Sequence, residues 1–178
     1  MKLLNYINTI QHQEKPLKFI FSKIIFRLKI SKIFTFKHKH HILKFYPSYL
    51  SRILWVDPNH GHSGSEVENF VWKYLRPNDI FVDIGANIGT VTLEASKKIG
   101  DNGKVFSFEA NPKIFQFLKG NVKLNNCTNI ELHNLALGEK TSQINFSDID
   151  SDESNSIQNN SNGIIVQMKT LEIGRAHV

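Results

Sequence analysis

Two carboxylates and a short glycine loop have the residue types and the spacing of a ligand-binding site. Asp83 closes a hydrophobic run, and Gly85 and Gly89 follow it at Gly-x-x-x-Gly spacing. Glu109 ends a second hydrophobic run, 26 residues after Asp83. In an open parallel sheet, ligands bind at the carboxyl ends of the strands. If both runs are parallel strands, Asp83 and Glu109 are therefore expected to face one crevice.

The loop fits a dinucleotide poorly. Dinucleotide sites usually carry Gly-x-Gly-x-x-Gly, whose middle glycine lets the backbone approach the pyrophosphate. The loop from Gly85 to Gly89 lacks that middle glycine. Asp83 would also repel a pyrophosphate in a site that excludes water. A nicotinamide-dependent Rossmann oxidoreductase therefore remains only as an alternative.

S-adenosylmethionine suits these residues better, because it has no phosphate and carries a positive sulfonium and a positive amino group. Asp83 favours positive charge, directly or through water, and the two glycines let the chain pass close to the methionyl end. The Glu109 carboxylate can accept hydrogen bonds from both ribose hydroxyls. We therefore predict S-adenosylmethionine as the cofactor.

Strands and helices are predicted to alternate around these residues. The expected order is strand 80–83, helix 90–98, strand 105–109, helix 112–124 and strand 129–133. Asn111 and Pro112 are typical of an N-cap and a first helical residue. This alternation predicts an α/β fold with a parallel sheet and right-handed crossovers.

Other elements are predicted on either side of this core. Residues 40–56 are expected to form two short strands around a turn at Pro47 and Ser48. The capping box from Ser65 to Glu68 predicts a helix that ends before Pro77. Its expected apolar face consists of Val67, Phe70, Val71 and Leu75.

Residues 142–146 and 163–169 are predicted to form a hairpin. The segment between them, 147–162, is rich in Asp, Ser and Asn. It is interpreted either as a solvated loop or as a lid over the substrate.

Four segments resemble the FkbM family of class I methyltransferases. They are Phe81 to Gly89, with its Gly-Ala-Asn-x-Gly core, Gly103 to Glu109, Asn121 to Asn125, and Asn134 to Gly138. The resemblance runs from about residue 45 to Leu171. It implies a Rossmann-like class I methyltransferase fold, of which only the first half of the parallel sheet is present. It also implies O-methylation of a hydroxyl on a sugar, a glycan or a small-molecule natural product.

The resemblance also implies a set of cofactor-binding residues. These are Asp83, Gly85, Ala86, Asn87, Gly89, Glu109 and Ala110. Asn134 and Leu135 are expected to border the adenine. No general base is identified. His60 and His62 precede the helix that starts near Ser65, and they are interpreted either as solvated loop residues or as groups that reach the site.

Positive charge is concentrated at the N-terminus. Residues 1–46 contain ten Lys and Arg residues and one acidic residue, whereas the remaining 132 contain 12 basic and 15 acidic residues. Residues 1–40 are therefore interpreted as a basic amphipathic segment ahead of a methyltransferase domain at 41–171. No nucleic-acid partner is expected, because the body is acidic and contains no motif that reads bases.

Residues 17–30 have helical periodicity within this basic segment. Their expected apolar face consists of Leu17, Ile20, Phe21, Ile24, Ile25 and Leu28. Such a helix either packs this face on the domain or makes a peripheral contact with an anionic membrane surface.

The cluster His38 to His41 could ligate a metal, but no Cys or carboxylate completes a set nearby. It is interpreted as surface, and no metal site is predicted. Cys127 is the only cysteine, and the sequence contains no apparent signal peptide and no apolar stretch of about 18 residues. A cytoplasmic location is therefore predicted.

Residues 172–178 resemble the translation of a sequencing adapter and are predicted to be an artefact of truncation. A domain that ends near Leu171 would leave the strand at 80–83 as an exposed apolar edge. We therefore expect the chain alone to be poorly stable and inactive. A second alternative is a fragment that acts only as a basic surface-binding module.

Overall fold

The computed structural model describes residues 15–57, 65–147, 157–158 and 163–171. In chain order, the elements are α2 (Pro16–Arg27), η1 (Ser31–Ile33), β1 (Thr35–His38), β2 (His41–Lys44), α3 (Tyr49–Val56), α4 (Ser65–Tyr74), β3 (Ile80–Ile84), α5 (Thr90–Ile99), β4 (Lys104–Phe108), α6 (Pro112–Leu124), β5 (Ile130–His133), β6 (Ala136–Leu137), β7 (Ser142–Phe146), β8 (Ile157–Gln158) and β9 (Ile164–Lys169). No helix among these residues is both long and apolar enough to span a membrane.

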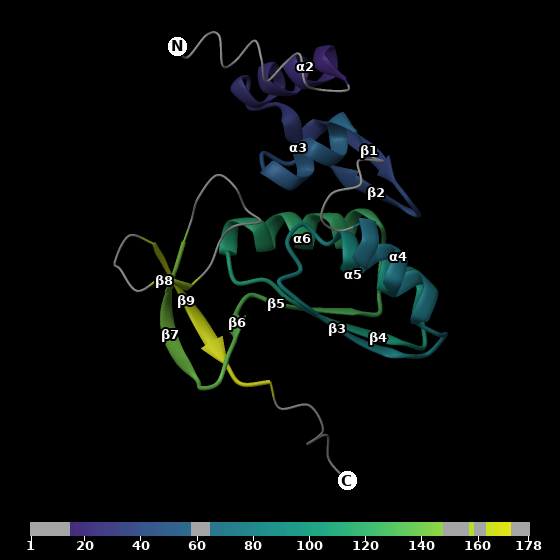
Figure 1. The fold of residues 1–178 in the computed structure, drawn as a ribbon, viewed down its shortest axis with the longest axis vertical. Coiled ribbons are helices and arrows are strands. Elements are labelled where there is room, and N and C mark those ends of the chain that lie inside the picture. The colour runs from purple at the N-terminus through teal and green to yellow at the C-terminus, as the bar shows by residue number, and fades with distance from the viewer. Residues whose placement is uncertain (1–14, 58–64, 148–156, 159–162, 172–178) are drawn as a thin grey trace.

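The predicted α/β alternation is confirmed. Strands β3, β4 and β5 form a parallel sheet in that order, and Asp83 pairs with Ser107 and Ile84 with Phe108. Figure 1 shows α4, α5 and α6 on one face of this sheet, with the hairpin β1–β2, α3 and α2 beyond them. The Asn111 side chain caps α6 as predicted, because Oδ1 accepts hydrogen bonds from the Lys113 and Ile114 amides.

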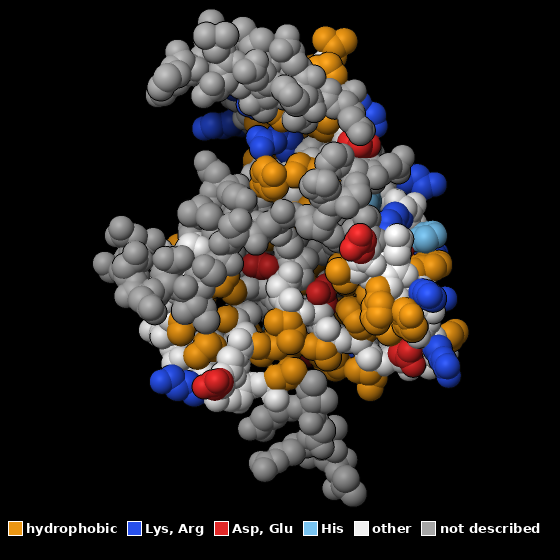
Figure 2. Space-filling model, viewed as in Figure 1, with side chains coloured by type: hydrophobic (Ala, Val, Ile, Leu, Met, Phe, Trp, Pro, Cys, Tyr) orange, Lys and Arg blue, Asp and Glu red, His pale blue; other side chains and the backbone are white. Residues whose placement is uncertain are grey.

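Strand β3 lies at one edge of this sheet within the described part of the chain. Its residues Ile80 and Ile84 are 71% and 61% exposed. Figure 2 shows apolar side chains gathered over the part of the surface where β3 and β4 lie. The expectation of an exposed apolar edge at 80–83 is therefore met.

A second sheet follows the first, with the strand order β6-β9-β7-β8. The predicted hairpin is confirmed, because β7 and β9 pair antiparallel from Ser142 opposite Met168 to Phe146 opposite Ile164. Strand β6 was not predicted, and it pairs parallel with β9. Most of the segment 147–162 lies outside the described residues, and so do residues 172–178.

The prediction for residues 40–56 is confirmed for its first strand, which is β2 (His41–Lys44), and wrong for its second. The strands of this region are β1 and β2, and Tyr49 to Val56 form the helix α3 instead of a second strand. Ser48 ends the extended segment and caps α3, because its Oγ accepts a hydrogen bond from the Ser51 amide at 3.2 Å. Leu50 and Leu54, one helical turn apart, are buried in the core. The boundary proposed at residue 40 falls inside the turn between β1 and β2.

Two predicted apolar faces differ from the packing that the structure shows. In α4, Val71 is buried, but Val67 and Phe70 are 51% and 60% exposed. The buried face of α4 instead includes Glu68, which lies three residues before Val71. The Glu68 carboxylate is paired with His38. In α2, the buried residues are Ser22 and Ile25. Among the apolar residues predicted for this face, Leu17, Phe21 and Ile24 of α2 and the C-cap residue Leu28 are strongly exposed.

The interpretation of His38 to His41 as surface is also wrong for two of its histidines. His38 and His41 are 2% and 6% exposed. His38 and Lys39 both contact the buried Glu68 carboxylate, at 3.0 and 2.8 Å. We call the residues His38 to His41, together with the carboxylates of Glu68 and Glu94 that they contact, the histidine clasp.

Glu94 of α5 holds the other half of the clasp. It lies within 2.8 Å of His40 Nδ1 and 3.0 Å of His41 Nδ1 and is fully buried. The His40 ring also stacks on Trp72 of α4, with 3.9 Å between ring centroids. The clasp therefore fastens the hairpin β1–β2 to both α4 and α5. No group of three or more metal-ligating side chains is found among the described residues.

Candidate functional site

Asp83 lies near the carboxyl end of β3 and is 9% exposed. Its Oδ2 accepts a short hydrogen bond from Thr92 Oγ1 in the first turn of α5, at 2.5 Å. Thr92 Oγ1 also lies 2.9 Å from Ser107 Oγ of β4, so the three side chains join β3, α5 and β4. Burial raises the pKa of Asp83, although hydrogen bonds from Thr92 oppose this effect.

Glu109 follows the last residue of β4 and is 8% exposed. Its Oε2 accepts a hydrogen bond from the Asn87 amide at 2.9 Å, and its Oε1 accepts one from the Asn111 amide at 2.8 Å. One carboxylate thus joins the glycine loop to the start of α6. A carboxylate oxygen can accept more than one hydrogen bond, so a carboxylate at this position can also accept from hydroxyl donors.

The loop 85–89 is tied to the end of β4 by its backbone. The Gly85 and Ala86 amides both donate to the Phe108 carbonyl at 2.9 Å. Gly89 has φ +94°, and a Cβ there would stand 2.5 Å from Leu118 Cδ1. Only glycine therefore fits where the loop turns into α5. The Ala86 methyl is buried in the hydrophobic core, so only the backbone of Ala86 is available to a ligand.

Two features of this loop fit the predicted cofactor. Gly85 has φ +79°, and a Cβ added there would meet no atom within 4 Å, so space is open beside the backbone. Asn87 has a left-handed φ of +49°, and its buried Oδ1 has no hydrogen-bond partner among the described residues. An unpaired buried acceptor is costly unless a ligand supplies a donor. A cofactor with an ammonium group and hydroxyls supplies such donors.

The other predicted residues border the same place. Asn134 follows β5, and its Nδ2 donates to the Glu109 carbonyl at 2.8 Å and to the Ala110 carbonyl at 3.1 Å. Ala110 is thereby held beside Glu109. The structure thus brings the predicted cofactor residues together at the carboxyl ends of β3 and β4. His60 and His62 lie outside the described residues.

The sequence assigned no role to Thr92 or Asn121, although Asn121 begins one of the FkbM-like segments; both support the site. A Thr in the first turn of a helix after a strand-end Asp is a signal that could have identified Thr92. Asn121 Nδ2 donates to the Ile88 carbonyl of the loop at 2.8 Å, from a point 33 residues away in sequence. No local pattern marks that contact.

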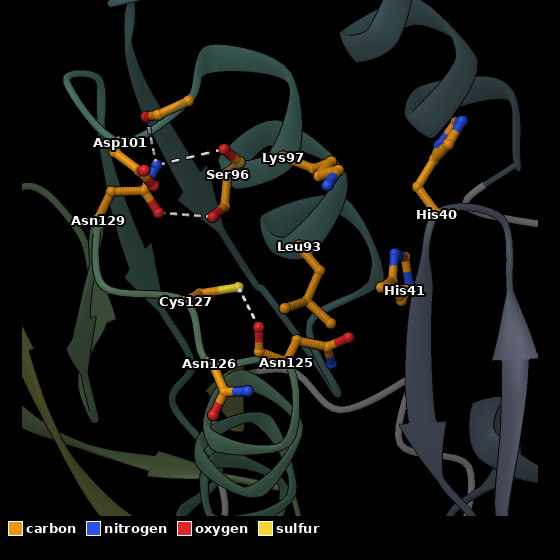
Figure 3. A pocket seen from close by; sticks show the side chains of 11 residues that line it. His40, His41, Leu93, Ser96, Lys97, Asp101, Asn125, Asn126, Cys127 and Asn129 are labelled. Atoms are coloured by element: carbon orange, nitrogen blue, oxygen red, sulfur yellow. Dashed lines mark hydrogen bonds between the residues drawn. The ribbon is translucent and has the colours of Figure 1, made fainter.

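A cavity of about 370 Å³ lies elsewhere. Figure 3 shows its side chains, which come from the hairpin β1–β2, from α5 and from the segments that precede β4 and β5. They are His40, His41, Leu93, Ser96, Lys97, Asp101, Asn125, Asn126, Cys127 and Asn129. The turn that contains Asp101 and the residue Asn129 precede strands, so this cavity is at the amino ends of the sheet. It is therefore distinct from the cofactor loop at the carboxyl ends.

A family model described as the TRM5/TYW2 methyltransferase domain matches residues 52–168, about two thirds of the chain. The chain belongs to this family. Membership confirms the expected fold class and S-adenosylmethionine as the cofactor of the domain. It supports a class I methyltransferase, but it does not single out the FkbM family.

The curated relatives that this chain matches are similar to it only over short stretches. The chain is 43% identical over 54 residues to a probable cobalt-precorrin-6B C(15)-methyltransferase (decarboxylating) from Sulfurisphaera tokodaii. That stretch covers 29% of this chain and 28% of the relative. The chain thus matches less than a third of the length of this relative.

Similar solved structures include a precorrin-6y C5,15-methyltransferase from Geobacter metallireducens, with 29% identity, a TM-score of 0.36 and coverage of 42% of this chain and 40% of that chain. TYW2 from P. horikoshii in complex with MeSAdo has 21% identity and a TM-score of 0.43. It covers 57% of this chain and 35% of its own.

The comparisons correct one expectation drawn from the sequence. The absence of a nucleic-acid partner was expected because the body is acidic and carries no base-reading motif. That expectation is wrong, because the family model that matches residues 52–168 is the TRM5/TYW2 methyltransferase domain, and methyltransferases of this type act on RNA. Composition fails here because an enzyme that modifies RNA needs a reactive site and a phosphate-binding surface, but no recognition helix of the kind that reads DNA bases.

Proposed function

We propose that this protein catalyses methyl transfer from S-adenosylmethionine held by the loop 85–89 and by Asp83, Glu109 and Ala110. The observation that carries the proposal is that the Asn87 backbone amide donates to Glu109 Oε2 at 2.9 Å while the buried Asn87 Oδ1 has no hydrogen-bond partner among the described residues. The cofactor, when bound, supplies an activated methyl group to a nucleophile.

The residues of the chain would divide the work of binding. The Glu109 carboxylate would accept the ribose hydroxyl hydrogens, and Asn87 Oδ1 would accept a hydrogen bond from a cationic or hydroxyl donor. Asp83 would contribute negative charge near the methionyl end while its bond to Thr92 fixes the start of α5. Gly85, Ala86 and Gly89 would contribute backbone and space, and Ala110 would border the adenosine. Such fixed alignment is the main contribution of a protein to a displacement reaction.

For the acceptor, our first candidate is an RNA. The family match over residues 52–168 supports it, since relatives of this type act on RNA. Charge supports it as well, because residues 1–46 hold ten basic groups and one acidic group. Lys and Arg side chains near phosphates release counterions and so give affinity that falls steeply with salt.

The second candidate is a hydroxyl on a sugar, a glycan or another small molecule. The FkbM-like segments, above all Gly85 to Gly89 and Asn134 to Gly138, favour it. The relatives named as precorrin methyltransferases act on a small molecule, although on carbon and not on oxygen. A location in the cytoplasm, where Cys127 stays reduced, is compatible with either acceptor.

Tritiated S-adenosylmethionine separates these candidates. The purified protein is incubated with total RNA and, separately, with a mixture of sugars and small-molecule hydroxyl compounds. We expect acid-precipitable label that ribonuclease removes and that falls as salt rises from 50 to 200 mM. Label in the small-molecule fraction alone would favour the second candidate. Thermal stabilisation by NADH without any by S-adenosylhomocysteine would contradict both and revive the oxidoreductase.

A further inference from the structure

Asn121 makes a contact that the cofactor chemistry does not explain by itself. It lies on α6, is fully buried, and joins two segments that are distant in sequence. Its Nδ2 donates to the Ile88 carbonyl in the glycine loop at 2.8 Å, and its Oδ1 accepts from the Lys44 amide of β2 at 3.0 Å. One amide side chain therefore connects the N-terminal hairpin to the proposed cofactor loop.

Further contacts with α6 hold the hairpin and the residues that follow it in place. Asn125, one turn after Asn121, brackets the backbone of Ile42, since it accepts from the Ile42 amide at 2.9 Å and donates to the Ile42 carbonyl at 2.7 Å. Tyr46 stacks on Phe117 of α6 with 4.3 Å between ring centroids. A Cβ on Gly120 would collide with the Tyr46 hydroxyl, so this glycine permits the close approach.

The loop needs an external support at this point. Ile88 stands between Asn87, which has φ +49°, and Gly89, which has φ +94°. Such left-handed backbone persists only where the surroundings hold it in place. The Ile88 side chain is fully buried, and Asn121 fixes the Ile88 carbonyl. The Ile88 carbonyl belongs to the peptide between Ile88 and Gly89, so by holding it Asn121 fixes the loop backbone next to Asn87, whose Oδ1 has no partner among the described residues.

We infer that Asn121 is a positioning residue through which the hairpin β1–β2 sets the geometry of the cofactor loop. This inference rests on the proposed cofactor site. The hairpin lies before residues 52–168, so the contact ties a segment outside the matched family region to the site. The N-terminal hairpin is then part of the binding apparatus and not an appendage to it.

The test compares Asn121→Asp with Asn125→Asp by calorimetric titration with S-adenosylhomocysteine. Asn121→Asp keeps an acceptor for the Lys44 amide but turns a second acceptor toward the Ile88 carbonyl. At pH 8 we expect its affinity to fall about tenfold or more. The protonated acid can donate to that carbonyl, so the affinity should recover as the pH is lowered. Asn125→Asp contacts the hairpin without reaching the loop, and its affinity should stay within about twofold of wild type.

Hydrogen exchange on the wild-type protein gives a second readout that needs no variant. If the hairpin affects cofactor binding, cofactor binding must affect the hairpin to the same extent. Bound S-adenosylhomocysteine should therefore protect the Lys44 amide, which donates to Asn121 Oδ1, from exchange. We expect S-adenosylhomocysteine to slow exchange of the Lys44 amide more than that of the Ile42 amide, which Asn125 holds.

The outcomes are distinct. If wild-type protein does not bind S-adenosylhomocysteine, the proposed function fails. If it binds and Asn121→Asp binds equally well at every pH, the inference is overturned. Equal losses in the two Asp variants, or equal protection of the two amides, would reduce Asn121 to a structural contact and overturn it as well. Loss at pH 8 with recovery at lower pH in Asn121→Asp alone would establish it.

Discussion

Replacing Glu68 by Gln should remove a large part of the acid sensitivity of the fold. Glu68 is 1% exposed and paired with His38 and Lys39. Burial by itself would raise its pKa, but the hydrogen bonds from His38 and Lys39 outweigh burial and lower the pKa from 4.5 to about 2. A shift of this size corresponds to about 3 kcal/mol at roughly 1.4 kcal/mol per unit.

The sign of the effect follows from the lowered pKa. The unfolded chain binds a proton at Glu68 near pH 4.5, whereas the folded protein resists protonation until about pH 2. The stabilisation is therefore fully present above pH 4.5 and is lost as the pH falls toward 2. We expect wild type to be more stable than Glu68→Gln at pH 7, with a difference that shrinks by about 2 kcal/mol between pH 7 and pH 3, because part of the stabilisation remains until the pH falls below the folded pKa of about 2.

Urea unfolding followed by tryptophan fluorescence measures this difference at pH 7, 5, 4 and 3. Trp72 is a suitable reporter because its ring stacks on His40 in the clasp. Glu66→Gln is the matched control, since Glu66 lies in the first turn of the same helix and is exposed. A difference between wild type and Glu68→Gln that stays constant from pH 7 to pH 3 would refute the reasoning.

Three further changes test other parts of the structure. Burial raises the pKa of Asp83 above 3.8, so the stability of wild type relative to Asp83→Asn should fall as pH rises from 3.8 through the raised pKa; stability that rises over this range would contradict the assignment. Gly89→Ala should cost about 1–3 kcal/mol in urea unfolding relative to wild type, because φ is positive there and the added Cβ would meet the buried Leu118; an unchanged free energy of unfolding would refute this. Burial raises the pKa of the Cys127 thiol, so at pH 8 the thiol should react with a disulfide reagent several-fold more slowly in the folded protein than in urea; equal rates would count against its burial.

The βαβ core could be predicted from the sequence because its signals are local. Asn111 and Pro112 mark the start of α6, and the hydrophobic runs that end at Asp83 and Glu109 mark the strands. The two carboxylates could be brought together because parallel strands end at one edge.

The N-terminal region could not be predicted in the same way. His38 is partnered by Glu68, 30 residues later, and His40 by Glu94, 54 residues later. No pattern near the histidines reveals a partner at such a distance, so the cluster looks like a surface. In residues 49–56 the spacing of apolar residues is compatible with either a strand or a helix, and the cap by Ser48 decides between them.

Titration of the protein with S-adenosylhomocysteine by calorimetry, with Glu109→Gln and Glu131→Gln beside wild type, tests the central claim most directly. The Glu109 carboxylate accepts hydrogen bonds from the Asn87 and Asn111 amides. In Glu109→Gln, the side-chain NH₂ would face one of these amides as a second donor, and the neutral side chain would bind ribose hydroxyls more weakly. Glu131 lies on β5, pairs with Lys104 and is half exposed, so it serves as the control. We expect wild type and Glu131→Gln to bind alike and Glu109→Gln to bind at least about tenfold more weakly. Equal affinity in all three proteins would contradict the assignment of the cofactor to this loop.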